Sequence, residues 1–236
     1  MAQVRLYGVR IDNFGKKEAV ARALEPMGEP CTVVTPNALM LDACRREPRL
    51  RELLDRASLS LPDGAGVLLA ARRSGTVLKE RVAGIEFGEA LLECAARDGL
   101  RVFLLGGKDG IAVRAAQNLR ARYPSLCICG THWGYFGRDG EENRAVLSYI
   151  RACKADILFV CLGFPLQEEW IFENLGALSD LRVIAGLGGS LDVWAGTVRR
   201  APRAVSRLGL EWAWRMLCEP RRLRGLPALV RVWGGF

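Results

Sequence analysis

Short apolar runs alternate with longer amphipathic stretches along most of this 236-residue chain. Short apolar runs are typical of buried strands, and apolar residues three and four positions apart indicate helices. Strands are predicted at residues 4–11, 31–34, 58–61, 101–105, 126–129, 157–162 and 182–185. Helices are predicted at residues 16–27, 67–73, 87–97, 111–123, 142–154 and 167–175, and another holds Pro36 in its first turn. The alternation predicts an α/β fold with a mostly parallel sheet and helices on both faces.

Small and polar residues follow five of the predicted strands. They form loops at residues 35–37, 63–64, 106–107, 163–167 and 186–189. Each loop alone is typical of a turn that needs Gly, Pro or Asn. In a parallel sheet the carboxyl ends of the strands share one edge, where ligands usually bind. The five loops together therefore predict one binding crevice.

Asp63, between Pro62 and Gly64, is the best candidate for a catalytic base. A carboxylate held in a turn beside a substrate can accept a proton from an attacking hydroxyl. The same carboxylate could instead bond its own turn or cap the next helix. The spacing leaves both interpretations open.

Two glycine-rich loops are candidates for binding phosphate. Gly106 and Gly107 precede a predicted helix, so backbone amides there could meet a phosphate while Lys108 adds charge. The loop that contains Gly188 has similar chemistry, but neither loop matches a P-loop or dinucleotide motif. The prediction is a diphosphate site shared by both loops. Gln167 and Glu168, in the first turn of a helix, suit either the helix dipole or sugar hydroxyls.

The net charge of +8 lies almost entirely at the C-terminal end. Residues 199–236 contain nine arginines and only two acidic residues, a net charge of +7, which leaves +1 for residues 1–198. A basic segment of this kind favours phosphate-rich partners, either nucleic acid or an anionic membrane surface.

The pattern within this basic segment favours the membrane. Apolar residues recur at helical spacing from Val205 to Met216, with arginines on another stripe and Trp212, Trp214 and Trp233 nearby. A basic amphipathic helix with Trp is typical of a segment that lies on a membrane surface. A helix packed on the body, with solvated arginines, is the alternative.

The cysteines and the N-terminus indicate the cytoplasm. The eight cysteines lie mostly within apolar runs, as buried free thiols do, and their spacing completes no metal site. His132 is the only histidine and has no neighbouring nucleophile, so a Ser-His-Asp or Cys-His centre is not predicted. No signal peptide or run of 18 apolar residues is present.

Several short motifs occur in a specific order along the chain. They are Thr35-Pro36-Asn37, Pro62-Asp63-Gly64, Arg81 with Gly84, Leu104-Leu105-Gly106-Gly107, Gly134-Tyr135-Phe136, Gly163-Phe164-Pro165-Leu166-Gln167-Glu168, Gly188-Gly189-Ser190-Leu191-Asp192, Ala195-Gly196, Arg200-Ala201-Pro202, Gly209-Leu210-Glu211-Trp212 and Glu219-Pro220-Arg221. This ordered set resembles the WecG/TagA/CpsF family of bacterial glycosyltransferases, and the resemblance covers nearly the whole chain.

The resemblance implies a Rossmann-like α/β domain at residues 1–198 and a basic helical appendage at residues 199–236 that meets the membrane. It implies transfer of N-acetylmannosamine or a related sugar from a UDP-sugar to an undecaprenyl-diphosphate-linked saccharide, with inversion and without a metal or other cofactor. The products of such enzymes are wall teichoic acid, enterobacterial common antigen or capsule. The enzyme would be peripheral on the inner face of the cytoplasmic membrane.

The resemblance also implies roles for particular residues. Asp63 would deprotonate the acceptor hydroxyl, with Thr35 and Asn37 in the same crevice. Gln167 would lie beside the donor, and Arg81 would meet the charge of the diphosphate or the acceptor. The arginines that would engage the lipid diphosphate or headgroups are Arg203, Arg207, Arg215, Arg221, Arg222 and Arg224.

The leaving UDP needs stabilisation of its developing charge. The sequence has no DxD motif, so amides of the glycine loops, helix N-termini, Lys108 and arginines would supply it. Tyr135 or Phe136 is expected either to stack on uracil or to lie in the core, and Asp192 could hold a ribose or sugar hydroxyl. The chain departs from the family's pattern at Glu86, where Asp is usual, and at Leu166 and Leu191, where Lys and Phe are common. These differences leave the donor sugar open.

Two other functions are alternatives to a membrane-bound glycosyltransferase. A nucleic-acid-binding protein would use the basic tail, but the tail is rich in Trp and Leu and carries no nucleic-acid motif. A soluble nucleotide-sugar enzyme would use the tail only for packing or to form a homo-oligomer. The sequence leaves the oligomeric state open.

Overall fold

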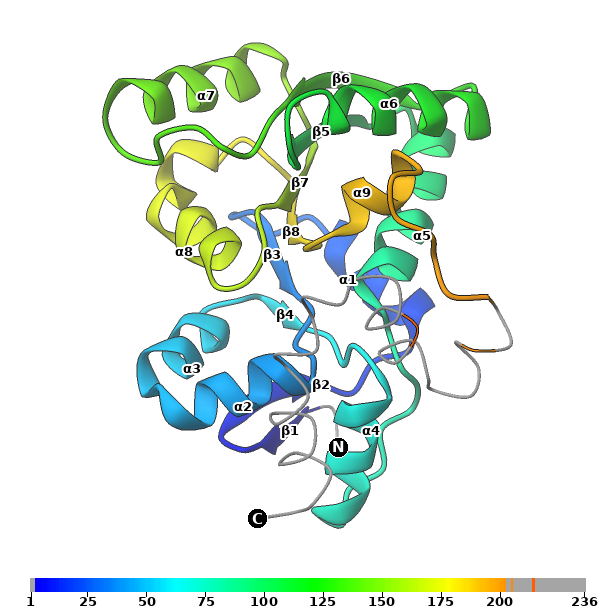
Figure 1. The fold of residues 1–236 in the computed structure, drawn as a ribbon, viewed down its shortest axis with the longest axis vertical. Coiled ribbons are helices and arrows are strands. Elements are labelled where there is room, and N and C mark those ends of the chain that lie inside the picture. The colour runs from blue at the N-terminus through cyan, green and yellow to red at the C-terminus, as the bar shows by residue number, and fades with distance from the viewer. Residues whose placement is uncertain (1–2, 203–204, 206–213, 215–236) are drawn as a thin grey trace.

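The computed structural model describes residues 3–202, Val205 and Trp214. Within these residues the chain forms a six-stranded parallel sheet with the strand order β4-β3-β8-β7-β5-β6 (Figure 1). The strands are β3 (Cys31–Val34), β4 (Leu59–Ser60), β5 (Arg101–Gly106), β6 (Cys127–His132), β7 (Ile157–Cys161) and β8 (Val183–Gly186). All ladders of this sheet are parallel, so the carboxyl ends of its strands share one edge.

The central strands β7 and β8 are apolar throughout because both faces of the sheet are covered. In β7, Ile157 and Phe159 belong to one hydrophobic core, and Leu158 and Val160 belong to the other. Alternate side chains of a strand point to opposite faces, so a strand at the centre of such a sheet must be apolar at every position. The predicted α/β fold with helices on both faces is confirmed.

Two groups of helices supply these two cores. The first core contains residues of α1 (Lys16–Leu24), α5 (Gly84–Asp98), α6 (Ile111–Arg122) and α9 (Ser190–Trp194). The second contains residues of α2 (Ala38–Arg46), α3 (Pro48–Asp55), α4 (Ala65–Arg73), α7 (Gly140–Ala152), α8 (Leu166–Glu173) and the 3₁₀ turn η1 (Leu175–Leu178). Figure 1 shows α5 and α6 on one side of the sheet and α8 on the other.

The single strand predicted at residues 4–11 is wrong. Residues Gln3–Leu6 and Val9–Asp12 form two strands, β1 and β2, which pair antiparallel as a separate hairpin. Tyr7 and Gly8 connect them, and both have positive φ angles, 51° and 84°. A two-residue hairpin turn with positive φ at both positions matches the natural twist of the strands. The turn was not predicted because the residues around it are apolar and Gly8 is the one residue there that is typical of a turn.

Helix starts also differ from the prediction near two prolines. Pro36 does not lie in the first turn of α2, because Asn37 is the N-cap and the helix begins at Ala38. Pro48 starts a separate helix, α3, which the sequence pattern did not distinguish from α2. Proline suits the first position of a helix, where its missing N–H has no partner to lose. The five-residue α9 was not predicted.

The cysteines in the described part of the chain are free thiols. Cys31, Cys44 and Cys161 are buried as predicted, while Cys94, Cys127, Cys129 and Cys153 are only partly buried. Burial raises the pKa of the Cys161 thiol to about 12, so it stays protonated. No helix within the described residues is both long and apolar enough to span a bilayer.

The C-terminal appendage lies almost wholly outside the described residues. Arg203, Arg207, Arg215, Arg221, Arg222 and Arg224 all fall there, so the predicted basic helix stays a prediction. Trp214 is described, and its indole N–H donates to the carbonyl oxygen of Arg199 at 3.3 Å.

Candidate active site

Two neighbouring strand ends bring the segment at residues 35–37 beside the turn that carries Asp63. β3 and β4 pair in parallel, and their pairing continues past the strands, since Leu61 N donates to Val34 O at 2.9 Å and Asp63 N to Pro36 O at 3.0 Å. The chains that follow the two strands therefore run side by side. Thr35 is buried and Asp63 is half-buried.

A third segment, residues 79–83, lies against the turn that carries Asp63. Val82 N donates to Pro62 O at 2.9 Å, which places Arg81 next to the turn that carries Asp63. Gly84 follows at the start of α5 and packs against Thr35, because a Cβ atom there would lie 2.9 Å from Thr35 Oγ1. We call the group formed by Thr35, Asp63 and Arg81 the Asp63 corner.

Asn37 has a structural task at this corner. Its Oδ1 accepts the backbone N–H groups of Leu39 at 3.0 Å and Met40 at 3.1 Å, which caps α2. The predicted contact of Asn37 with a substrate would then use its amide nitrogen.

Gln167 links α8 to the loop after β8. Its Oε1 accepts the backbone N–H of Gly188 at 2.9 Å, and its Nε2 donates to Glu168 Oε1 at 2.9 Å. Its side chain lies against Gly186, where a Cβ atom would come within 2.8 Å of Nε2. These contacts hold the Gln167 amide in place. They also explain why residue 186 is a glycine, because the packing alone leaves no room for a side chain there.

Glu168 is fully buried beside Gln167. Its Oε2 has no hydrogen-bond partner among the described residues. Burial raises the pKa of this carboxyl from 4.5 to about 7, and the Gln167 amide opposes the rise. The role of Glu168 with sugar hydroxyls stays a prediction. In the structure its Oε1 accepts a hydrogen bond from Gln167 and so helps to hold that amide in place.

The glycines after β5 are also explained by close packing. A Cβ atom on Gly106, whose φ is 136°, would lie 2.3 Å from the carbonyl oxygen of Cys161, and one on Gly107 would lie 2.6 Å from Ile111. Gly134 N donates to Gly107 O at 2.8 Å and closes the loop from the side of β6. Lys108 is exposed. A phosphate contact there stays a prediction, because packing alone requires these glycines.

The two aromatic candidates after β6 differ in exposure. Tyr135 is 66% exposed and stacks loosely on Trp133, with ring centroids 6.5 Å apart. Phe136 is buried and packs edge-on against Trp170 at 6.2 Å, so it is a core residue. Phe136 and Trp170 also line a hollow of about 500 Å³ between this loop and α8.

The five predicted loops share one edge but do not meet at one point. Among these loops, the one with Asp63 follows β4 and the one with Gly106 follows β5, and these two strands lie farthest apart in the sheet. Four strand spacings separate β4 from β5, about 19 Å at roughly 4.8 Å per spacing. The structure brings the segments that carry Thr35, Asp63 and Arg81 together at one end. It brings together Gln167, Glu168 and Gly188 near the centre.

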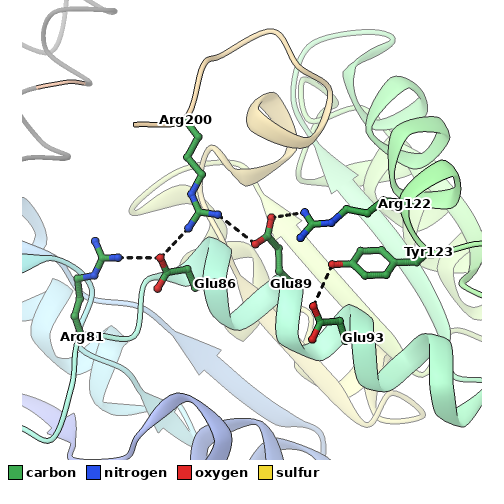
Figure 2. A network of polar contacts seen from close by, with 7 residues as sticks. All are labelled: Arg81, Glu86, Glu89, Glu93, Arg122, Tyr123 and Arg200. Carbon is green, nitrogen blue, oxygen red and sulfur yellow. Dashed lines mark hydrogen bonds and ion pairs between the residues drawn. The ribbon is translucent and has the colours of Figure 1, made fainter. Parts of the chain in front are cut away.

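A network of charged side chains that the sequence analysis did not recognise lies beside the Asp63 corner (Figure 2). Arg81 and Arg200 both contact Glu86, and Arg200 and Arg122 both contact Glu89. The sequence does contain a sign of this network, because Glu86 and Glu89 lie three residues apart and so share one face of α5.

Asp192 lies in the first turn of α9, and its backbone oxygen accepts from Thr197 and Val198. Its predicted contact with a sugar hydroxyl is untested. No group of three or more His, Cys, Asp or Glu side chains that could hold a metal ion occurs in the described part of the chain.

Comparison with known proteins identifies the family. The model of the glycosyl transferase WecG/TagA/CpsF family matches residues 4–233. The chain belongs to this family. Its glycosyltransferase relatives include proteins of Staphylococcus aureus strains MRSA252 and NCTC 8325, each 32% identical over 232 residues, which is 97% of this chain and 89% of each relative. Both relatives are named N-acetylglucosaminyldiphosphoundecaprenol N-acetyl-beta-D-mannosaminyltransferase.

The family membership confirms the resemblance and makes this chain a glycosyltransferase. The match includes all three residues of the Asp63 corner and most of the segment beyond residue 202.

Proposed function

We propose that this glycosyltransferase moves N-acetylmannosamine, or a closely related sugar, from a UDP-sugar to N-acetylglucosamine linked to undecaprenyl diphosphate. The relatives' names supply the sugar and the acceptor. The observation that carries the proposal is the Asp63 corner, where backbone hydrogen bonds hold the turn of the half-buried Asp63 beside the segments that carry the buried Thr35 and Arg81 at the carboxyl edge of the sheet.

Asp63 acts as the base in this proposal. Its carboxylate takes the proton from the acceptor hydroxyl as that oxygen forms a bond to the anomeric carbon of the donor. The bond between that carbon and the β-phosphate oxygen breaks, and UDP leaves with the electron pair. Attack opposite the leaving group inverts the anomeric centre. A β-linked product, as in the relatives' names, then requires an α-linked donor.

The leaving diphosphate needs positive charge and N–H donors. Arg81 is a cation at the Asp63 corner, and the loop after β8 lies next to β3 in the sheet. The N–H groups of Leu187, Gly188 and Ser190 donate within the fold, so the N–H of Gly189 is the donor that we propose for the diphosphate. Preorganised donors of this kind stabilise developing charge without further rearrangement. We therefore propose that the reaction needs no divalent metal.

The acceptor is a lipid, so the enzyme must meet the inner face of the cytoplasmic membrane. The +7 charge of residues 199–236 supports this part of the proposal, because each basic residue near an anionic surface contributes about 1 kcal/mol of attraction. The synthesis of a cell-surface polysaccharide or teichoic acid is the pathway class that such a product enters.

A panel of UDP-sugars with a short-chain lipid-diphosphate N-acetylglucosamine acceptor tests the function. We expect one donor to add a single N-acetylhexosamine, or its uronic acid, to the acceptor by product mass, in the presence of excess EDTA. Absence of product with every donor would refute the function. Loss of product in EDTA, restored by Mg²⁺ or Mn²⁺, would refute only metal independence. Salt-sensitive binding to duplex DNA without binding to vesicles would favour the nucleic-acid alternative.

A further inference from the structure

Two arginines from distant parts of the sequence share one carboxylate oxygen next to the Asp63 corner. Arg81 Nη2 lies 2.9 Å from Glu86 Oε1, and Arg200 Nη2 lies 2.8 Å from the same atom (Figure 2). The side chains of Arg81, Glu86 and Arg200 are 17%, 25% and 32% exposed. Hydrogen bonds between charged groups with this much burial are stronger than ordinary surface ion pairs.

The carboxylate of Glu86 stands on a rigid support. It belongs to the first turn of α5, between Ile85 and Phe87, which are both buried in the core. The same turn begins at Gly84, which is packed against Thr35. Glu86 is therefore fixed relative to Thr35 at the end of β3.

Arg200 is held at two points on the same helix. Its Nη1 lies 3.2 Å from Glu89 Oε2, and Glu89 Oε1 in turn accepts from Arg122 at 2.8 Å. The neighbouring Arg199 accepts a hydrogen bond from Trp214. The start of the C-terminal segment is thus attached to the helix that holds Arg81.

We propose that Glu86 is a positioning residue, which orients the Arg81 guanidinium at the start of α5 and couples it to Arg200 at the start of the C-terminal segment. This inference rests on the proposed function, because Arg81 is taken to meet substrate phosphate. A guanidinium has five N–H donors, enough to bind a carboxylate and a phosphate together, and the bond to Glu86 restricts the rotation of the side chain. In this proposal Arg200 acts on Arg81 through Glu86.

Kinetics of Glu86→Gln, Arg81→Gln, Arg200→Gln and the double variant Glu86→Gln/Arg81→Gln test the coupling. We expect Glu86→Gln to raise the KM for a diphosphate substrate about tenfold with a small change in kcat, and Arg200→Gln to raise it less. The double variant should be no worse than Arg81→Gln alone, because Glu86 acts through Arg81. Effects of Glu86→Gln and Arg81→Gln that multiply, or an unchanged KM in Glu86→Gln, would overturn the proposal.

Glu93→Gln is the matched control. Glu93 lies on the same helix and accepts a long hydrogen bond, 3.4 Å, from Tyr123, away from Arg81 (Figure 2). Its KM should equal that of the wild type. Glu86→Asp keeps the charge on a shorter side chain and should fall between the wild type and Glu86→Gln, which separates positioning from misfolding.

Hydrogen–deuterium exchange without substrate gives a second readout. Exchange at residues 79–83 and 197–202 should both become faster in Glu86→Gln and stay unchanged in Glu93→Gln. Unchanged exchange at either segment in Glu86→Gln would overturn the coupling. An inactive wild type with this exchange pattern would refute the proposed function and leave the coupling standing.

Discussion

Glu168 shows how burial alone changes the chemistry of one carboxyl group. Its pKa rises from 4.5 to about 7 because the ionised form loses its hydration, and the Gln167 amide compensates only in part. Between these two values the folded protein binds a proton that the unfolded chain has released. The free energy of unfolding therefore falls as the pH rises through this window.

Replacing Glu168 with Gln should remove that pH dependence. From pH 5 to pH 7.5 we expect the wild type to lose about 2–3 kcal/mol of unfolding free energy relative to Glu168→Gln, at about 1.4 kcal/mol per pH unit. Urea unfolding of both proteins at the two pH values measures this difference in unfolding free energy. Glu173→Gln, an exposed residue of the same helix, should follow the wild type. Parallel pH profiles for wild type and Glu168→Gln would mean that the carboxyl titrates normally.

The sequence located individual site residues better than it explained them. Asp63 became a candidate base because it lies in a Pro-Gly turn after a strand, and that role stays a prediction. Asn37 and Gln167 were correctly placed at the edge of the sheet, but their bonds to the α2 amides and to Gly188 depend on packing that spacing does not show. Glu86 was noticed only as a departure from the family, because its two arginine partners lie 5 and 114 residues away.

At the scale of elements, α5 organises the site. Its first turn touches Thr35 through Gly84 and Arg81 through Glu86, and its next turn holds Arg200 through Glu89. The absence of a side chain at Gly84 allows this helix to approach the end of β3. The position of the helix and the geometry of the Asp63 corner therefore depend on each other.

Gly84→Ala should push α5 away from β3. The new Cβ would lie 2.9 Å from Thr35 Oγ1, and such overpacking costs about 1–3 kcal/mol. Adding Thr35→Ala removes the two nearest atoms, so the double variant should recover part of that loss in a double-mutant cycle by urea unfolding. Gly176→Ala, where nothing lies within 4 Å, should be neutral. Additive losses for Gly84 and Thr35 would show that the two residues are not in steric contact.

The elements that the sequence predicted well are those with a strong local pattern. The strand at 31–34 was correct at both ends, and the apolar runs that became β5 and β7 could fit only a doubly covered sheet. The hairpin of β1 and β2 was missed because the run that contains it is apolar across its turn. The break between α2 and α3 was missed because their apolar pattern continues across Pro48.

At the scale of the whole molecule, the net charge and the sheet lie in different parts of the chain. The near-neutral part of the chain forms the sheet and its two layers of helices, while most of the net charge follows it in residues 199–236. The family match extends through that basic segment to residue 233. We propose that the first part performs the transfer and the second brings it to the membrane.

The basic segment should give membrane binding that the body does not. Replacing Arg221, Arg222 and Arg224 with Gln should weaken binding to anionic vesicles roughly a hundredfold, at about 1 kcal/mol per arginine. Replacing the exposed Arg72, Arg73 and Arg114 of the body removes the same charge and should have little effect. Vesicle flotation measures both sets, and equal losses would mean that only the total charge matters.

The most direct test of the central claim is a single measurement on Asp63→Asn. Its single-turnover rate of sugar transfer to the lipid-diphosphate acceptor should fall by about 10²–10⁴-fold, because only the proton acceptor is removed. UDP affinity, measured on the same preparation by calorimetry, should stay at the wild-type value. A variant that transfers the sugar at nearly the wild-type rate would contradict the role of Asp63 as the base, and with it the mechanism proposed for this enzyme.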